Sequence, residues 1–381
     1  MNLDITEEQQ LVRDAARDFA AREIEPRAAE LDRAARWPTE IVAQLADLGF
    51  LGIAVPTEHG GAGLDNVSYA LVVEEISAAC ASCGVITSVN NSLFCDPLLK
   101  FGTDLQNREI LAPTASGKML GCFGLTEPTS GSDARTMLTV GQRQGDGSFV
   151  LNGSKNFITV GPEAEHVIVF AVTTPDPEKP RHTALLVRRG TPGYTLSPHD
   201  EKLGIKAAHS CTIYFDNVKV PQSHVLGEVG GGFKIAMATL DGGRIGIAAQ
   251  AIGIARAALD KAVAYAKERK AFKTPIASLQ AIQFMIADMA TEIDAARLLT
   301  LRAARMKDLG VRHTAESAMA KLLASEMATR VTHKALQIHG GYGYVAEYGV
   351  ERHYRDARIT EIYEGTSEIQ RVVIAAHEIR Q

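Results

Sequence analysis

The chain has little cysteine, a single tryptophan and no long apolar run. Its 381 residues include five cysteines, and a small, odd number of thiols does not build a disulfide framework. Cys80 and Cys83 have the C-x-x-C spacing of a redox pair or half a zinc site, but no second such pair follows. Their surroundings are typical of a helix in which small thiols pack. No apolar run approaches the ~20 residues that a membrane-spanning helix needs, so no membrane span is predicted.

Several other function classes lack support in the sequence. The net charge of -5 is modest and no basic stripe appears, which argues against a nucleic-acid partner. The Walker A loop, the H-E-x-x-H zinc motif and the G-x-S-x-G nucleophile turn are missing, and no metal site is predicted. Residues 341–346 match a loose dinucleotide fingerprint, but they follow a helix and not a strand. A bound dinucleotide is therefore not expected to sit on a Rossmann fold.

The first ten residues carry no targeting signal. They contain Asp4, Glu7 and Glu8, and they lack both the apolar centre of a signal peptide and the arginine-rich, acid-poor character of a transit peptide. The sequence therefore predicts a bacterial cytoplasmic protein, or a protein of the mitochondrial matrix if a presequence has been removed.

The composition changes twice along the chain, which predicts three domains. Residues 1–118 are expected to form an N-terminal helical domain and residues 119–230 a middle antiparallel β domain. Residues 231–381 are expected to form a C-terminal antiparallel helical bundle. The order of helices, sheet and helices favours an α+β fold over a doubly wound sheet.

Local signals place elements within these domains. Thr6 begins a capping box. Long periodic stretches predict helices over 277–309 and 315–339, the second stopped by a pair of glycines. Asp146-Gly147 and Asn152-Gly153 are both hairpin signals.

The most informative stretch is 360–370. Glu364 lies there between Tyr363 and Gly365. An aromatic neighbour can exclude water from a carboxylate and raise its pKa, which suits a general base, and a glycine lets the backbone pass close to a ligand. Taken alone, such a glutamate is more often a solvated acid at a helix start, so the interpretation depends on the rest of the chain.

Three further segments accompany this one. Residues 122–133 read CFGLTEPTSGSD, residues 269–272 read RKAF and residues 337–341 read QIHGG. In this order and at these spacings the four segments resemble the acyl-CoA dehydrogenase family, over nearly the whole chain. The stretch 84–93 is most similar to the short-chain, butyryl-CoA branch. It has no arginine to receive a substrate carboxylate, which argues against a glutaryl substrate.

The resemblance implies an oxidoreductase of fatty acid β-oxidation that uses FAD. It would convert a short-chain acyl-CoA to the trans-2-enoyl-CoA. Glu364 would remove the α-proton, and the β-hydrogen would be transferred to the flavin as hydride. The backbone N–H of Glu364 and a flavin hydroxyl would polarise the thioester oxygen. An electron-transfer flavoprotein would take up the electrons. In this family some FAD contacts come from a neighbouring subunit, so a homo-oligomer, and specifically a homotetramer, is expected.

The same resemblance assigns residues to the cofactor. Leu125 and Thr126 would contact the pyrimidine edge of the flavin. Phe157, where the family often has tryptophan, and Thr159 would lie near the flavin ring. Arg269 would bind the pyrophosphate, because a guanidinium suits bidentate hydrogen bonds to phosphate. The remaining predicted FAD contacts are Phe123, Ser132, Phe272, Gln280, Gln337, Ile338, Gly340, Gly341, Thr366 and Glu368.

The predicted substrate contacts are Ser132, Asp241, Arg244, Tyr363 and Gly365. From the residues alone, Asp241 is expected to cap a helix that begins near Leu240. A minority branch of the family places its catalytic glutamate in this segment, at the position that Gly243 holds here. That substitution leaves Glu364 as the predicted base.

Three alternatives stay open. A branched-chain acyl-CoA dehydrogenase and an acyl-CoA oxidase would share the scaffold. The third, from another class, is a flavoprotein that kept the fold as a non-catalytic binding module. The presence of Glu364, Thr126, Thr159 and Arg269 together speaks against this last alternative.

Overall fold

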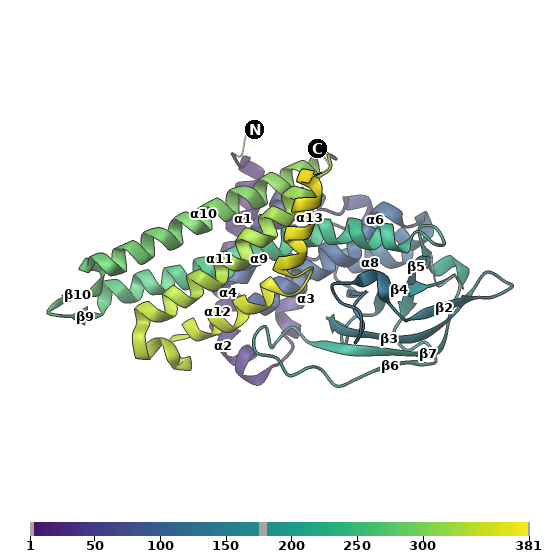
Figure 1. The fold of residues 1–381 in the computed structure, drawn as a ribbon, viewed down its shortest axis with the longest axis horizontal. Coiled ribbons are helices and arrows are strands. Elements are labelled where there is room, and N and C mark those ends of the chain that lie inside the picture. Colours follow the sequence, from purple (N-terminus) through teal and green to yellow (C-terminus); the bar gives the residue numbers. More distant parts are fainter. Residues whose placement is uncertain (1–3, 175–180, 380–381) are drawn as a thin grey trace.

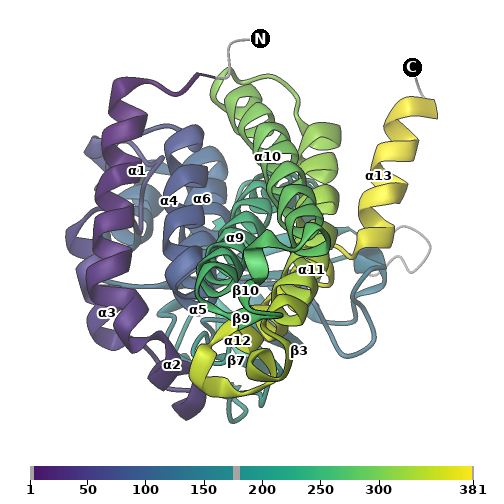
Figure 2. The same ribbon diagram turned by 90° about the vertical axis from the view of Figure 1, so that its left-hand side faces the viewer.

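The computed structural model describes residues 4–174 and 181–379. Along the chain it has a helical region, a β region and a second helical region, so the predicted α+β fold is confirmed. Figure 1 shows the β region at one end of the molecule, beside a bundle of long helices, and Figure 2 shows N-terminal helices along one side of that bundle. Within the described residues, no helix combines the length and the apolar character needed to cross a bilayer.

The N-terminal region is a set of packed helices. They are α1 (Glu7–Phe19), α2 (Glu25–Ala34), α3 (Thr39–Asp47), α4 (Asn66–Ala79), α5 (Ala81–Ser88), α6 (Asp96–Phe101), α7 (Asp104–Gln106) and α8 (Ala112–Ala115). Thr6 caps α1 with the predicted capping box, in which its side chain accepts from the Gln9 amide and its own N–H donates to the Gln9 side chain. Helix α5 and the π-helical turn Val89–Cys95 are buried throughout. All five cysteines are free and buried; this agrees with the packing interpretation of Cys80 and Cys83, which lie directly before and within α5.

The β region is one twisted sheet. Its strands are β1 (Gly121–Gly124), β2 (Val140–Arg143), β3 (Phe149–Thr159), β4 (His166–Val172), β5 (His182–Arg188), β6 (Tyr194–Leu196), β7 (Ser210–Val220) and β8 (Val225–Leu226). The order is β6-β7-β3-β2-β4-β5-β8, with β1 beside β4. The pairs are antiparallel except those of β4 with β1 and with β2. The Asp146-Gly147 turn joins β2 to β3, as predicted.

Asn152 and Gly153 do not form a hairpin turn, and that prediction is wrong. They lie inside β3, where its pairing with β7 shifts register. Gly153 has a φ of +140°, and a Cβ at this position would lie 2.8 Å from the Thr139 Cα. The glycine therefore serves a bulge and a close approach of two backbones. A local turn signal cannot reveal such an approach, because it depends on the neighbouring strand.

The C-terminal region is built on three long helices, α9 (Gly232–Glu268), α10 (Gln280–Asp308) and α11 (Thr314–His339). The last two agree with the predicted helices. A small hairpin of β9 (Lys270–Ala271) and β10 (Thr274–Pro275) joins α9 to α10, and α12 (Val350–Ala357) and α13 (Ser367–Ile379) follow α11.

Asp241 does not cap a helix, which corrects a second prediction. It lies inside α9, which begins at Gly232 and continues through Gly242 and Gly243. Glycine has low intrinsic helix propensity, but burial of most of α9 in the core overrides it. The continuous helix places Gly243 against Glu364, and the neighbouring Gly242 faces Lys307 and Asp96.

Candidate active site

Glu364 lies on the turn between the 3-10 segment Arg358–Glu361 and α13. Its backbone is left-handed, with a φ of +52°, and Gly365 follows with a φ of +92°. A left-handed non-glycine residue costs roughly 1–3 kcal/mol and persists only when its surroundings enforce it. Gln370 Nε2 donates to the Glu364 carbonyl (3.1 Å) and to the Gly365 carbonyl (2.8 Å). The fold therefore imposes this turn, and with it the direction of the Glu364 side chain.

The Glu364 carboxylate lies directly on the backbone of α9. A Cβ built on Gly243 would be 1.8 Å from Glu364 Oε2, which no structure tolerates. Leu93 closes the same space, with its Cδ2 2.8 Å from that Cβ position. Gly243 is thus the residue that lets the carboxylate occupy this place, and Leu93 brings the stretch 84–93 into the same site.

Burial governs the protonation of Glu364. Loss of solvent raises the pKa of this carboxyl to about 7, although the nearby cations Lys321 and Arg244 both lower it. Oε2 is buried and has no hydrogen-bond partner in the described part of the chain. A carboxylate that titrates near neutrality and has an uncommitted oxygen is suited to accept a proton.

Arg244 and Asp241 form an ion pair beside this carboxylate. Arg244 is only 4% exposed, and its Nη1 donates to Asp241 Oδ1 at 2.7 Å. Thr314 on α11 donates to Asp241 Oδ2 at 2.7 Å. The pair thus joins α9 to α11 and holds one cation near Glu364 without a direct hydrogen bond to it.

Tyr363 is fixed by a residue that sequence reasoning missed. Its hydroxyl donates to Gln250 Oε1, and Gln250 Nε2 donates to the Ala81 carbonyl at 2.9 Å. Gln250 is fully buried in the middle of α9. A polar amide within an otherwise apolar helical stretch was the available signal, since a buried amide needs partners.

A buried ion pair anchors the loop that contains Leu125 and Thr126. Lys155 Nζ on β3 lies 2.6 Å from Glu127 Oε1 and donates to the Leu125 carbonyl at 3.1 Å. Glu127 in turn accepts from the amides of Leu138 and Thr139. Sequence reasoning missed this pair; the signal was a lysine at an inward position of β3.

The other predicted flavin contacts surround this loop. Phe157 has a φ of +57° and is 66% exposed, at a second register shift of β3. Thr159, at the end of β3, is half-buried, and Ser132 is exposed. Phe123 packs on Phe170 with ring centroids 4.9 Å apart. An exposed aromatic ring on a bulged strand beside an irregular loop is suited to cover a planar ligand.

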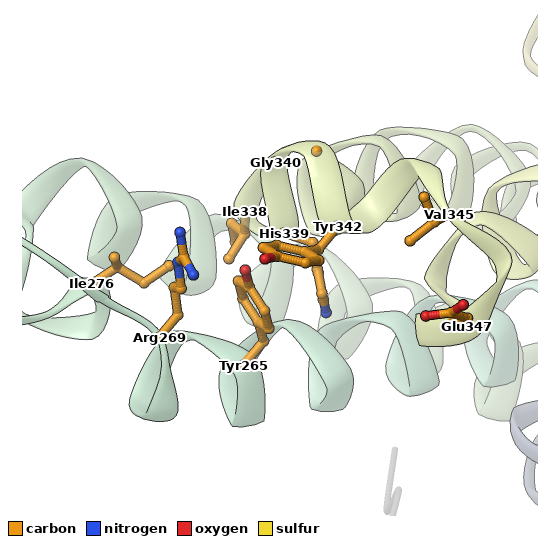
Figure 3. A pocket seen from close by; sticks show the side chains of 10 residues that line it. Tyr265, Arg269, Ile276, Ile338, His339, Gly340, Tyr342, Val345 and Glu347 are labelled. Carbon is orange, nitrogen blue, oxygen red and sulfur yellow. The ribbon is translucent and has the colours of Figure 1, made fainter.

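A second group of predicted residues lies in a separate pocket of about 590 Å³ between the C-terminal ends of α9 and α11 (Figure 3). Tyr265 and His339 stack there with centroids 4.4 Å apart. Its lining residues are Tyr265, Arg269, Ile276, Ile338, His339, Gly340, Gly341, Tyr342, Val345 and Glu347. The predicted contacts Phe272, Gln280, Gln337, Thr366 and Glu368 are not in that lining; Phe272, 88% exposed, lies between β9 and β10.

The chemistry of the two regions fits the expected FAD. Arg269 offers a cation for a pyrophosphate, and the stacked rings suit a purine. A Cβ on Gly340 or Gly341 would meet no atom within 4 Å, so the backbone there is open to a ligand. Figure 1 shows the β9–β10 hairpin, next to Arg269, at the opposite end of the molecule from β3.

Three family descriptions match the chain in order. "Acyl-CoA dehydrogenase, N-terminal domain" covers residues 6–118, "Acyl-CoA dehydrogenase, middle domain" covers 122–218, and "Acyl-CoA dehydrogenase, C-terminal domain" covers 230–379. The chain therefore belongs to the acyl-CoA dehydrogenase family.

Individual relatives show which members of that family this chain is similar to. The mitochondrial short-chain specific acyl-CoA dehydrogenase of Bos taurus is 52% identical over 379 residues, which cover 100% of this chain and 92% of the relative. Butyryl-CoA dehydrogenase from Megasphaera elsdenii is 44% identical with a TM-score of 0.97 over 100% of both chains. A chain from the structural study of the electron transferring flavoprotein of Acidaminococcus fermentans has the same identity, coverage and TM-score.

These findings confirm the expected class of enzyme. The chain is an oxidoreductase of the acyl-CoA dehydrogenase family, whose members depend on FAD, so the predicted cofactor is confirmed as well. The roles of individual residues, and the boundaries of the three domains, stay predictions.

Gly243→Ala should displace the Glu364 carboxylate. The new methyl group needs the space of Oε2, and misplacing a reacting group by about 1 Å can cost ~10²-fold in rate. We expect substrate-driven flavin reduction, measured by stopped-flow absorbance, to slow by about 10- to 100-fold with unchanged FAD content. Alanine favours helix over glycine, so damage to α9 would not explain such a loss.

Gly145→Ala is the matched control. Gly145 lies in the β2–β3 turn, where a Cβ would meet no atom within 4 Å. The control should keep the wild-type rate. A wild-type rate in Gly243→Ala as well would show that the reaction does not need the carboxylate in this position.

Proposed function

We propose that this protein is a short-chain acyl-CoA dehydrogenase. It converts a short, straight-chain acyl-CoA to the trans-2-enoyl-CoA and passes the electrons to an electron-transfer flavoprotein. The observation that carries the proposal is the half-buried Glu364 side chain, whose buried and uncommitted Oε2 lies on the bare backbone of Gly243. The named substrates of the relatives, and the likeness to the chain from the Acidaminococcus fermentans study, support the substrate and the electron acceptor.

In this proposal Glu364 removes the α-proton of the thioester. Its ionised form is favoured by Arg244 and Lys321, while burial keeps its pKa near neutrality. Bound FAD supplies the two-electron acceptor. Tyr363, held by Gln250, forms a fixed wall next to the base and keeps water from it.

The short-chain preference has a structural motive besides the relatives. The stretch 84–93, which resembles the butyryl branch, is buried along its whole length. Leu93 reaches the space beside Gly243 and Glu364. A short acyl chain needs little further room next to the base, whereas a long one would have to displace packed side chains.

We assign the cofactor contacts in two groups. The loop and strand residues Phe123, Leu125, Thr126, Ser132, Phe157 and Thr159 would hold the flavin half. The residues Arg269, Phe272, Gln280, Gln337, Ile338, Gly340, Gly341, Thr366 and Glu368 would hold the ADP half, with Ser132, Asp241, Arg244, Tyr363 and Gly365 on the acyl-CoA.

The separation of these groups supports an oligomer. The β9–β10 hairpin, which directly follows Arg269, and strand β3 lie at opposite ends of one chain (Figure 1). One FAD would therefore join the two regions only if a second chain supplied Arg269 and its neighbours. We infer a homotetramer assembled through the C-terminal helices, in a bacterial cytoplasm or a mitochondrial matrix; both bacterial and mitochondrial relatives exist.

The first test is an acyl-CoA panel. Anaerobic flavin bleaching should give a higher kcat/KM for butyryl-CoA than for octanoyl- or palmitoyl-CoA, because a longer chain would have to displace the buried side chains of residues 84–93. A higher value for octanoyl-CoA would overturn the chain-length assignment and leave the reaction type intact. Preference for a branched chain would favour the branched-chain alternative, and fast reoxidation of the reduced flavin by oxygen would favour an oxidase.

Glu364→Gln keeps the side-chain volume and removes the base. We expect flavin reduction by butyryl-CoA to slow by at least ~10²–10⁴-fold, with FAD content and acyl-CoA binding retained. In the wild type, the rate should fall as the pH drops below about 7, because the raised pKa of Glu364 then leaves the carboxyl protonated. Glu326→Gln is the control, since Glu326 pairs with Arg371 on the surface. Near-normal reduction in Glu364→Gln would show that the base lies elsewhere.

Arg269→Ala tests the shared cofactor site. Loss of the guanidinium removes the cation of the second pocket, so FAD should dissociate more readily and the assembly should loosen with it. Flavin absorbance after gel filtration and the mass from light scattering measure both effects. Lys234→Ala, an exposed change near the start of α9, should alter neither. A wild type that is monomeric and binds FAD fully would contradict the shared site.

A further inference from the structure

Lys321 is a buried cation whose direct contact with the turn that carries Glu364 has no part in the proposed chemistry so far. It lies on α11 with its side chain fully buried, and its Nζ donates to the Gly365 carbonyl at 2.7 Å. A buried ammonium loses its hydration, and an apolar residue of similar length would avoid that cost. The position of this lysine therefore calls for a specific explanation.

The bond from Lys321 falls on the turn that carries Glu364. Gly365 has a φ of +92° and Glu364 a φ of +52°. Gln370, from the first turn of α13, donates to the carbonyls of both residues. Two donors from two different helices thus converge on the Gly365 carbonyl and hold two successive left-handed residues in place.

We propose that Lys321 is a positioning residue for Glu364, which locks the turn through the Gly365 carbonyl and supplies a fixed positive charge that favours the ionised base. Gln370 shares the first task and, being neutral, does not share the second. This inference rests on the proposed function, in which Glu364 removes the α-proton.

The charges around Glu364 support an electrostatic role for Lys321 that the neutral Gln370 cannot have. Glu364 is faced by Lys321 from α11 and by Arg244 from α9, and Arg244 is paired with Asp241. Tyr69 from α4 and the neighbouring Tyr363 also face it, and burial keeps both phenols neutral by raising their pKa. Lys321 in turn is faced by Glu364, Glu361 and Glu368, and repelled by Arg244. Burial lowers the pKa of Lys321 to about 8, so it is still mainly charged at pH 7, where Glu364 ionises.

The experiment compares pH–rate profiles of flavin reduction by butyryl-CoA in single-site variants of the FAD-loaded protein. Lys321→Met removes the charge and the donor, so the acidic limb should move to higher pH by on the order of one unit. The plateau rate should also fall, by about 10- to 100-fold, because the turn loses one clamp. Gln370→Met removes only a donor, so its plateau rate should fall while the limb stays in place.

Lys334→Met is the matched control. It removes the same charge from the same helix, at an ion pair with Asp288 and Glu292 on the surface, and should leave both the limb and the plateau unchanged. An unmoved limb in Lys321→Met would overturn the electrostatic part, and so would an equal shift in Lys334→Met. If Lys321→Met does not fold, a wild-type plateau rate in Gln370→Met overturns the clamp.

These outcomes differ from failure of the proposed function. If the wild type reduces its flavin with butyryl-CoA and Glu364→Gln does not, the base is in place and the variants above test Lys321 alone. If no acyl-CoA reduces the wild-type flavin, or if Glu364→Gln still reacts normally, the proposed function fails and the positioning role falls with it.

Discussion

The desolvated Glu364 carboxylate above Gly243 is the constraint on which the rest of the site depends. Transfer of an ionised carboxylate out of water is costly unless charges or donors replace the water. Here Arg244 and Lys321 lower the pKa of Glu364 but neither forms a hydrogen bond to its uncommitted oxygen. A direct ion pair would occupy that oxygen and weaken it as a base. The arrangement thus keeps the carboxylate stable enough to ionise and free enough to react.

The shape of this space depends on helices that are cross-linked by ion pairs. Glu75 on α4 accepts from Arg17 on α1 and from Arg256 on α9. The adjacent Glu74 accepts from Arg297 on α10. Both carboxylates are buried, and the three arginines supply the positive charge that their burial requires. Two neighbouring residues of α4 therefore tie it to three helices and hold α9 in the position that Glu364 needs.

A buried ion pair likewise holds the loop that contains Leu125 and Thr126, beside the sheet. The irregular backbone around Leu125 and Thr126 cannot satisfy its own polar groups, so Lys155 donates to the Leu125 carbonyl. Glu127 pairs with this lysine and accepts from the Leu138 and Thr139 amides. The backbone N–H of Asn156 also donates to the Thr126 carbonyl, at 2.8 Å. A loop that has to approach a ligand closely is thereby held by buried contacts, and its outer surface stays open.

The sequence by itself determined the features that local physics controls. The capping box at Thr6, the long helices α10 and α11 and the Asp146-Gly147 turn follow from hydrogen bonding and periodicity within a few residues. The four motifs were sufficient to indicate the family and its cofactor, because each is a contiguous string with its own chemistry.

Only the tertiary structure decided which distant residues meet. It brings the Glu364 carboxylate against the Gly243 backbone, and it brings the Lys321 ammonium to the Gly365 carbonyl. It also made Asn152-Gly153 a bulge where a turn was expected, and it carried α9 straight through Asp241. The physical reason is the same in each case. Burial, close backbone approach and the pairing of charges arise between segments that are far apart in the chain, and no local pattern records which segments those will be.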